Sequence, residues 1–499
     1  MKHLRSLREF IEALKEMDDV QPIDIEVDWK LEIGAIIRRS YDLRAPAPLF
    51  NNIKDYENTG FRVLGAPGAL SASKERQLCR MALAFGLPAN ASGQQIMEAL
   101  VAAHDRQPLP PKMTDASRAP CKENIQTGDA IDLFSFPTPL IHSNDGGRYL
   151  QTYGINIVST PDGSWTNWSV NRMMIVDKSR LSCLIPPLQH LGIIRSRWAA
   201  LHKPMPIVLA LGVEPAIPFV GAMPLPEGVD ESHYLGAYFG EPLEVVKAET
   251  VDLPVPATAE IVIEGHISVT DQDQAMEGPM NEYPGYNAHD ASPKPVFHVS
   301  AITYRNNAIL PVVAAGPPVE EDHTATGTMH AAEILYNLRK ADLPVSSCWF
   351  SFESANHWLI IAIKSNWHER LAIHSKDLAQ KIGEIVFTGK PGFGVPKILL
   401  VEDDVDITDI NQVVWAFSTR AHPSHGEIYF PAEPNAILFV YLDPAERATY
   451  KATKVIHNCL LADRFSKDEI PVKGSFENGW PLDIQQKVLR QWTQYGYRP

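Results

Sequence analysis

The sequence has few cysteines, no long apolar run and no excess of basic residues. Its longest apolar runs, 207–213 and 436–442, are far too short to cross a bilayer. The net charge of −15 argues against nucleic acid or an anionic membrane as the main partner, because both attract clustered Lys and Arg. The cysteines are scattered, odd in number and without a C-x-x-C pair, which argues against a zinc–thiolate site and fits a reducing compartment. They are Cys79, Cys121, Cys183, Cys348 and Cys459.

The N-terminal stretch MKHLRSLREFIEALKEM has the pattern of an ordinary amphipathic helix. Apolar residues recur at Leu4, Leu7, Ile11 and Leu14, and glutamates lie between them. Secretory signals need an apolar core and transit peptides avoid acidic residues. We therefore expect the first helix of a folded domain, and a cytoplasmic protein.

The order of elements predicts an α+β protein with several domains. Mixed helical and strand patterns fill the first part of the chain, which ends at a proline-rich stretch, QPLPPK. Short β-type runs separated by turns follow, and they are typical of a barrel-like domain. From about residue 324 helix and strand alternate, as in α/β units. We expect an N-terminal α/β segment at 1–110, a β-barrel-like domain at 111–322, an α/β domain at 323–442 and a C-terminal segment with a docking helix at 443–499.

One β-type run, TNWSVNRM, carries an unusual set of polar residues. On a continuous strand Asn167, Ser169 and Asn171 would share one face, and Arg172 would lie on the other. An amide, a hydroxyl and a guanidinium this close together can bind a phosphate or a carboxylate. A solvated edge strand would show the same residues, and the pattern alone favours that interpretation.

Two loops also hold residues suited to chemistry. IPPLQH ends in Gln189 and His190, where two prolines fix the backbone just before a possible metal ligand. EGPMNEYPGY places Glu277 and Glu282 on either side of a Gly-Pro turn, where burial or mutual repulsion would raise the pKa of one carboxyl and make it a proton donor. Each loop read alone is better explained without chemistry, with the histidine as a surface or satisfied core residue and the glutamates as a solvated pair. Together they supply the oxygen-rich ligand set with one imidazole that suits magnesium or manganese.

These segments belong to a longer series of motifs that resembles the UbiD-like decarboxylases, near the ferulic acid and aromatic acid decarboxylase branch. The series runs in family order from about residue 45 to 420. Its members are LFNNIKDY, RVLGAPG, PCKEN, SNDGGRYLQTYG, PDGSWTNWSVNRMM, IPPLQH, MPLPEGVDESHYLGA, EGPMNEYPGY, TYRNNAILP and WAFSTR. The resemblance implies that the β-barrel-like (split-barrel) domain binds prenylated FMN and that the α/β domain mediates oligomerisation.

The resemblance also assigns the cofactor site. Asn167, His190 and Glu231 match the ligands of a divalent metal, Mn2+ or Mg2+, that holds the flavin phosphate. A K+ ion is implied nearby, on carbonyl groups around Trp168 and Ala222 with help from Glu231. Four further residues fall where the family contacts its cofactor, and Arg172 is shared with the catalytic set. The four are Ser169, Gln189, Met223 and Lys390.

Arg172, Glu277 and Glu282 match the family's catalytic network. The implied reaction is reversible, non-oxidative removal of CO2 through a covalent adduct with prenylated FMN. Because nothing stabilises the anion left on an sp2 carbon, a cofactor must accept the electrons. Arg172 would orient the substrate carboxylate, Glu277 would hold Arg172, and Glu282 would deliver the proton that replaces CO2.

The expected substrate wall departs from the ferulate enzymes. Tyr283 and Thr326 stand where those enzymes carry apolar side chains, and Leu438 lies in a divergent stretch. Because a hydroxyl can bind a ring substituent, we expect an aromatic acid, hydroxylated or heteroaromatic. His323 and His330 are further possible substrate contacts, and the start of a surface helix explains both equally well.

Three alternatives remain beside this expectation. A cinnamic or ferulic type of acid would react by cycloaddition. A flavin-free metal-dependent hydrolase could be built on Asn167, His190 and Glu231, and a flavin-binding assembly protein would need no catalytic arginine. The resemblance further implies a flavin prenyltransferase as cofactor supplier and a homodimer or higher homo-oligomer. The amphipathic stretch 482–495 would dock on a partner subunit or on its own domain.

Overall fold

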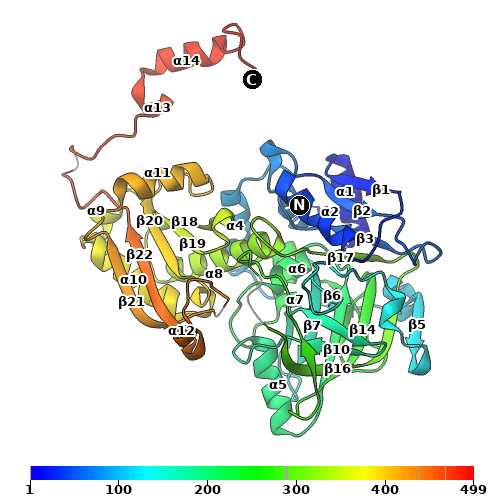
Figure 1. Cartoon of the computed structure of the whole chain (residues 1–499). Helices are drawn as coiled ribbons and strands as arrows, with labels where there is room; N and C mark the ends of the chain where they lie inside the picture. Colours follow the sequence, from blue (N-terminus) through cyan, green and yellow to red (C-terminus); the bar gives the residue numbers. More distant parts are fainter. Residues whose placement is uncertain (1, 287–289, 437, 467, 499) are drawn as a thin grey trace.

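A computed structural model describes residues 2–498 apart from 287–289, 437 and 467, and it divides the chain into two bodies with a C-terminal arm (Figure 1). The N-terminal part contains a four-stranded sheet in the order β1-β2-β3-β17. Its strands are β1 (Val20–Ile23), β2 (Ala47–Phe50), β3 (Arg62–Gly65) and β17 (Ile309–Val312). Its helices are α1 (Leu7–Glu16), α2 (Glu32–Leu43), α3 (Cys79–Ala84) and α4 (Gly93–Ala103).

Helix α1 forms where the sequence predicts it. The side chain of Ser6 accepts a hydrogen bond from the backbone N–H of Glu9 and caps the first turn. The apolar stripe that includes Leu7 and Leu14 is buried against residues of β2 and β3. Burial of this stripe, more than intrinsic helix propensity, therefore fixes the helix on the sheet.

The largest sheet has ten strands and curls through the lower right of the molecule in the view of Figure 1. Eight of them run in the order β6-β9-β10-β16-β14-β11-β7-β8, and β5 and β15 pair with β16. The strands are β5 (Asn124–Thr127), β6 (Tyr149–Gln151), β7 (Gly154–Ser159), β8 (Thr166–Ser169), β9 (Met173–Asp177), β10 (Arg180–Cys183), β11 (Met205–Leu211), β14 (Ile261–Ile267), β15 (Gln274–Glu277) and β16 (Ser292–Tyr304). In β11, Ile207 and Leu209 enter one core cluster and Val208 and Ala210 enter another. The sheet is therefore covered on both faces, which explains why β11 reads as a continuous apolar run.

Three helices connect strands of this sheet and cover its edge near β8. They are α5 (His190–Ala200), α6 (Ala216–Gly221) and α7 (Glu231–Phe239). A small sheet combines β4 (Lys112–Met113), which precedes these helices in the chain, with β12 (Glu244–Lys247) and β13 (Pro254–Pro256), which follow them. Two of the predicted ligands, His190 and Glu231, are the first residues of α5 and α7, so the helix starts bring them to the end of β8.

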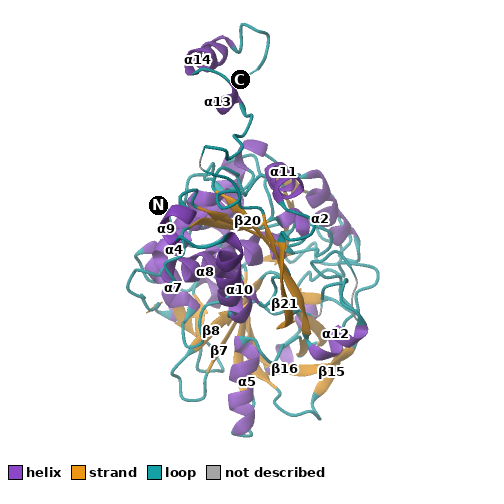
Figure 2. Cartoon of the chain, turned by 90° about the vertical axis from the view of Figure 1, so that its left-hand side faces the viewer, coloured by secondary structure: helices purple, strands orange, loops and turns teal. Residues whose placement is uncertain are grey.

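The second body is an α/β domain that α8 connects to the rest (Figure 2). Its five-stranded sheet has the order β18-β19-β20-β22-β21. The strands are β18 (Val345–Phe350), β19 (Trp358–Ile363), β20 (Lys397–Glu402), β21 (Glu427–Pro434) and β22 (Lys451–Asn458). The helices are α8 (Gly327–Lys340), α9 (Trp367–Leu371), α10 (Ser375–Thr388), α11 (Ile410–Arg420) and α12 (Pro444–Thr449). Because β22 lies between β20 and β21, the sheet continues past residue 442, where we expected this domain to end.

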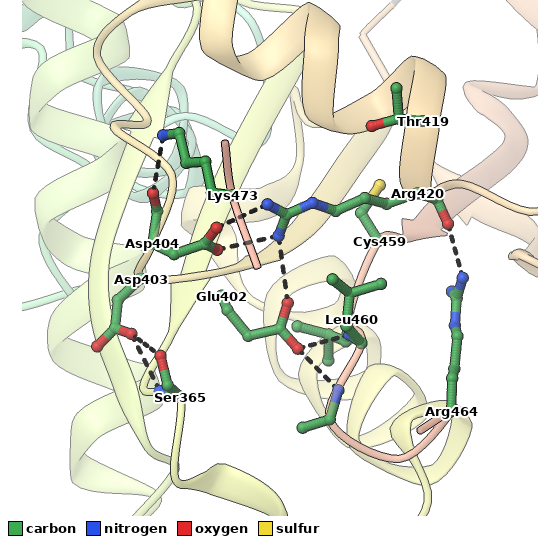
Figure 3. Close-up of polar contacts among 12 residues, drawn as sticks. Ser365, Glu402, Asp403, Asp404, Thr419, Arg420, Cys459, Leu460, Arg464 and Lys473 are labelled. Carbon is green, nitrogen blue, oxygen red and sulfur yellow. Dashed lines mark hydrogen bonds and ion pairs between the residues drawn. The ribbon is translucent and has the colours of Figure 1, made fainter. Parts of the chain in front are cut away.

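The chain ends in an arm that leaves the α/β domain and carries α13 (Phe476–Gly479) and α14 (Leu482–Gln491) (Figures 1 and 2). No residue of α14 is buried. The start of the arm is fastened by polar contacts (Figure 3): Arg464 donates to the carbonyl of Arg420 at 2.7 Å, and Lys473 donates to the carbonyl of Asp404 at 3.2 Å. The expected mixed α+β, multidomain architecture is confirmed, including the curled sheet of the middle domain.

Candidate active site

The three predicted metal ligands lie together at the edge strand β8. The Asn167 side chain lies 2.9 Å from Oε1 of Glu231 and 3.4 Å from Nδ1 of His190, measured from Nδ2. All three side chains are buried, and Oδ1 of Asn167 has no hydrogen-bond partner among the described residues. The described residues contain no group of three or more His, Cys, Asp and Glu placed to hold a metal ion, so a metal here would depend on the amide of Asn167.

Burial governs the charges of this cluster. Loss of water around the ring, together with the positive charge of Lys390, lowers the pKa of His190 to about 3, so the imidazole is neutral, as a metal ligand must be. Burial raises the pKa of Glu231 to about 8 and lowers the pKa of Lys390 to about 8. Lys390 belongs to the α/β body, in the turn η8 (Lys390–Gly392), and its Nζ lies 2.6 Å from Nε2 of His190. The site is therefore built from both bodies of the molecule.

The predicted catalytic trio also comes together. Nε and Nη2 of Arg172 donate to the two oxygens of Glu277 at 2.9 and 3.2 Å, and Nη1 donates to Glu282. Glu277 ends β15, and the following Gly278 has a φ of +89°. This conformation is easy for glycine alone and turns the chain so that Glu282 reaches the same guanidinium. One arginine thus lies between two carboxylates from one loop.

The stretch 166–173 is not the continuous strand that we expected. Strand β8 ends at Ser169 and β9 begins at Met173, so the alternation of faces stops at the break. The alternative of a solvated edge strand is also wrong in part: β8 is an edge strand, but Asn167 and Trp168 are buried in it. The break lets the side chains of Asn167 and Arg172 reach two separate clusters.

The other residues assigned to the cofactor lie around these clusters. Ser169 donates to Asn171 at 3.2 Å, and Asn171 donates to Gln189 at 3.1 Å. Met223 is buried just after α6. The backbone N–H of Trp168 donates to Oε2 of Glu231 at 2.7 Å. Ser169, Asn171 and Gln189 thus form one chain of hydrogen bonds beside the predicted ligands.

Two residues of the expected substrate wall, His323 and His330, are already hydrogen-bonded within the protein. His323 is fully buried, with Nδ1 2.9 Å from Glu320 and Nε2 2.8 Å from the carbonyl oxygen of Tyr283. His330 is likewise occupied, with Nδ1 3.0 Å from the carbonyl oxygen of Pro391. Both rings therefore position the backbone. The surface-helix interpretation of His323 is wrong, since no part of its ring reaches solvent.

Tyr283, Thr326 and Leu438 are half-buried. Thr326 ends the π-helical turn η6 (Asp322–Thr326) that precedes α8. Tyr283 packs with the cluster around Phe439 in the loop after β21, the same loop that holds Leu438. The α/β body therefore contacts the catalytic loop directly at Tyr283.

Two further residues belong to the site and were not predicted. Tyr149, fully buried in β6, donates its phenol O–H to Oε1 of Glu277 at 2.7 Å. Asp322 begins η6 and lies within electrostatic range of Arg172 and Tyr283. Tyr149 stands in the motif SNDGGRYLQTYG, which signalled the family but no role for the tyrosine. Asp322 follows two glutamates, and such a run reads as the acidic first turn of a helix.

Comparison with known proteins agrees with this geometry. Three domains of 3-octaprenyl-4-hydroxybenzoate carboxy-lyase match the chain: the N-terminal domain at residues 11–100, the Rift-related domain at 112–318 and the C-terminal domain at 323–459. The chain belongs to the UbiD family. Membership makes it a carboxy-lyase, the class that we expected from the motifs.

Curated UbiD-family relatives match nearly the whole chain. Pyrrole-2-carboxylic acid decarboxylase of Pseudomonas aeruginosa is 44% identical over 490 residues, and the match covers 98% of each chain. Ferulic acid decarboxylase 1 of Saccharomyces cerevisiae is 39% identical, also over 98% of each. Among solved structures, an evolved dimeric form of the UbiD-class enzyme HmfF from Pelotomaculum thermopropionicum, in complex with prFMN, is 27% identical with a TM-score of 0.76. That match covers 96% of this chain and 99% of the other.

The described part of this UbiD-family chain contains no helix long and apolar enough to cross a membrane. All five cysteines are buried and unpaired. Burial raises the pKa of the thiols of Cys121 and Cys459 to about 12. These thiols are therefore inert packing groups.

Proposed function

We propose that this enzyme catalyses the reversible, non-oxidative decarboxylation of an aromatic or heteroaromatic carboxylic acid with prenylated FMN. The observation that carries the proposal is the placement of Arg172 between Glu277 and Glu282. A guanidinium binds a substrate carboxylate through paired donors, and a carboxyl group beside it can donate a proton to the carbon that loses CO2.

The residues present fit a flavin phosphate bound through a metal. Asn167, His190 and Glu231 would hold the metal, because they offer an unpartnered amide oxygen, a neutral imidazole and a carboxylate within 4 Å of one another. Lys390 would contact the phosphate. We further propose Mn2+ or Mg2+ as the metal, and K+ near Trp168, Ala222 and Glu231. Ser169, Gln189 and Met223 would contact the flavin.

When bound, the prenylated flavin would supply the electron sink that loss of CO2 from an sp2 carbon requires. The chain's own residues would do the rest. Arg172 would orient the substrate carboxylate, and Glu277, held by Tyr149, would fix the plane of the guanidinium. Glu282 would carry the proton and deliver it to the carbon after CO2 leaves.

The proposed substrate class draws on both the site and the relatives. Tyr283 brings a hydroxyl to the substrate wall, and burial keeps it protonated by raising its pKa well above the usual value. The similarity to a pyrrole-2-carboxylic acid decarboxylase supports a heteroaromatic acid. Similarity to ferulic acid decarboxylase 1 supports an α,β-unsaturated acid as the second candidate.

We also propose a homodimer or higher homo-oligomer in the cytoplasm, with a flavin prenyltransferase as cofactor supplier. The exposed side chains of α14 and its flanks support a subunit contact, since an amphipathic helix rarely leaves its apolar stripe in water. Leu482 is 67% exposed and Leu489 is 65% exposed. The α/β body would carry the contact between subunits.

The variant Glu282→Gln tests the proposal. It removes the proton donor and keeps the side chain's shape, so we expect turnover to fall at least about 1000-fold. The flavin absorbance of the purified protein should not change, because Glu282 is not among the residues proposed to hold the metal or to contact the flavin. Glu227→Gln, an exposed glutamate paired with Arg197, is the matched control and should keep full activity. An active Glu282→Gln enzyme would contradict the assignment.

A further inference from the structure

The turn η6 holds an acidic side chain that the proposed reaction does not use. Of residues 320–325, Asp322 alone is exposed, whereas Glu321 and His323 on either side are buried. The exposure is not that of an outer surface. Enough protein surrounds the carboxyl to raise its pKa to about 7, and the largest cause is loss of water. Asp322 is thus open to solvent, and yet nearby protein removes part of the hydration of its carboxyl.

The backbone around Asp322 is fixed and its carboxyl is left free. Its N–H donates to Oε2 of Glu320 at 2.8 Å, and its carbonyl accepts from Nδ2 of Asn356 at 3.3 Å. Asn356 also donates to the carbonyl of His323 at 3.1 Å. No hydrogen bond or ion pair within the described part of the chain reaches the carboxyl oxygens of Asp322. The backbone of Asp322 is thus fixed, and its carboxyl has no hydrogen-bond partner among the described residues.

Asp322 lies beside the catalytic loop, because the next residue, His323, is hydrogen-bonded to Tyr283 at 2.8 Å. Asp322 interacts electrostatically with Arg172 and with the phenol of Tyr283. Tyr283 directly follows Glu282, and its carbonyl accepts from His323, the residue after Asp322. The side chain of His323 therefore joins η6 to the catalytic loop. A molecule whose carboxylate binds Arg172 would then extend its ring toward Tyr283 and Asp322.

We propose that Asp322 selects substrates that present a hydrogen-bond donor, a ring N–H or a ring O–H, on the part of the ring that faces η6. The inference rests on the proposed function. A carboxylate accepts hydrogen bonds from donors and has none to give, so a donor-bearing ring satisfies it. A ring with only C–H or an ether oxygen there would leave a desolvated carboxyl unpaired, which is costly.

Matched pairs of acids test this selection on the holoenzyme. Pyrrole-2-carboxylate against furan-2-carboxylate compares a ring N–H with a ring oxygen, and 4-hydroxybenzoate against 4-methoxybenzoate compares an O–H with its ether. We expect the wild-type enzyme to favour one donor-bearing acid by about 100-fold or more in kcat/KM. The pair with the larger ratio identifies the donor as N–H or O–H.

The variant Asp322→Leu should reduce that ratio to below about 10-fold, and Asp322→Asn, which keeps an acceptor oxygen, should fall between the two. Asp342→Asn, an exposed residue beyond the far end of α8, is the charge-matched control and should keep the wild-type ratio. Dissociation constants measured in a Glu282→Gln background, where turnover does not interfere, should show the same order of preference ratios among the Asp322 variants. If the leucine variant is unstable, the asparagine variant decides.

The outcomes separate the two proposals. If the wild-type holoenzyme decarboxylates none of the acids, the proposed function fails. If it decarboxylates them and both Asp322 variants keep the wild-type ratio, the decarboxylase assignment stands and the role of Asp322 is overturned. A wild-type enzyme that prefers the donor-free partner in both pairs overturns it as well.

Discussion

At the scale of single residues, the bond from Tyr149 to Glu277 makes a direct prediction. Tyr149→Phe removes one donor from a carboxylate that also holds Arg172. Hydrogen bonds to charged groups contribute about 1.5–3 kcal/mol, so we expect kcat/KM to fall about 10- to 100-fold. If Tyr149 acts by orienting Arg172 in the transition state, kcat at saturating substrate should fall by nearly the same factor as kcat/KM.

A second tyrosine provides the control for that experiment. Tyr234 is buried and donates to the carbonyl of Leu100 at 2.7 Å, with no bond to Arg172, Glu277 or Glu282. Tyr234→Phe loses the same kind of bond, so it should lower the melting temperature by a similar amount while kcat/KM stays unchanged. Equal losses of activity in the two variants would mean that Tyr149 is merely structural.

Asp322 makes the donor preference depend on pH. Burial and the negative charges of Glu320 and Glu321 raise its pKa to about 7, although His323 and Arg172 oppose the shift. Above pH 7 the group is an acceptor-only carboxylate, and below pH 7 it carries a proton and can itself donate. The preference for donor-bearing acids should therefore fall between pH 8 and pH 6. In Asp322→Asn the ratio should stay constant over this range, since the ratio of two substrates at one pH cancels the titration of shared groups.

The residues of the site were predictable from the sequence to different degrees. Asn167, His190 and Glu231 are distant in the chain, and only the motif series joined them, because periodicity gives no long-range pairing. Arg172 and Glu277 were found in the same way. Asp322 was missed because its proposed role depends on which side of a π-helical turn lies beside the catalytic loop, and that turn has no sequence signature of its own.

At the scale of elements, the polar cluster in Figure 3 holds β20, α11 and the start of the C-terminal arm together. Arg420, at the end of α11, binds Asp404 at 2.9 and 2.6 Å and lies 3.6 Å from the buried Glu402. Oε1 of Glu402 in turn accepts from the backbone N–H of Leu461 at 2.6 Å. One arginine thus neutralises a buried acid that fastens the chain after β22.

Arg420→Ala should therefore destabilise the α/β body by about 3–5 kcal/mol, because it leaves the carboxyl of Glu402 buried without its cation. Chemical denaturation followed by tryptophan fluorescence would measure the change. Arg370→Ala breaks an exposed pair with Asp342 and should cost less than about 0.5 kcal/mol. Similar losses in the two variants would show that the network does not stabilise the domain.

Most elements were predictable because their cores have simple periods. The stripe of α1 and the apolar run of β11 indicate their type directly. The break after Ser169 was not predictable, since TNWSVNRM alternates like one strand, and the contacts of β8 with α5, α6 and α7 come from distant parts of the chain. The extent of the α/β sheet was also missed: β22 returns to the middle of the sheet after a loop and a short helix, and sequence order gives no register for such a return.

At the scale of the whole molecule, the C-terminal arm predicts a separable assembly element. Deletion of residues 474–499 removes α13 and α14, which contain no buried residue, so the melting temperature of the remaining monomer should change little. The oligomer mass measured by light scattering should fall, because the exposed stripe with Leu482 and Leu489 is lost. A truncated protein that keeps the full oligomer would show that the arm is not needed for assembly.

The position of Lys390 has a consequence for how the two bodies move. The lysine comes from the α/β body, yet it donates to the carbonyl of Leu225 at 3.0 Å and contacts His190 in the other body. Any anion bound at this point is held from both sides, so its binding energy also opposes separation of the bodies. Binding of the anion would then couple the unfolding of the two bodies. The protein without the anion would unfold in two transitions, and the protein with the anion bound would unfold in one cooperative transition.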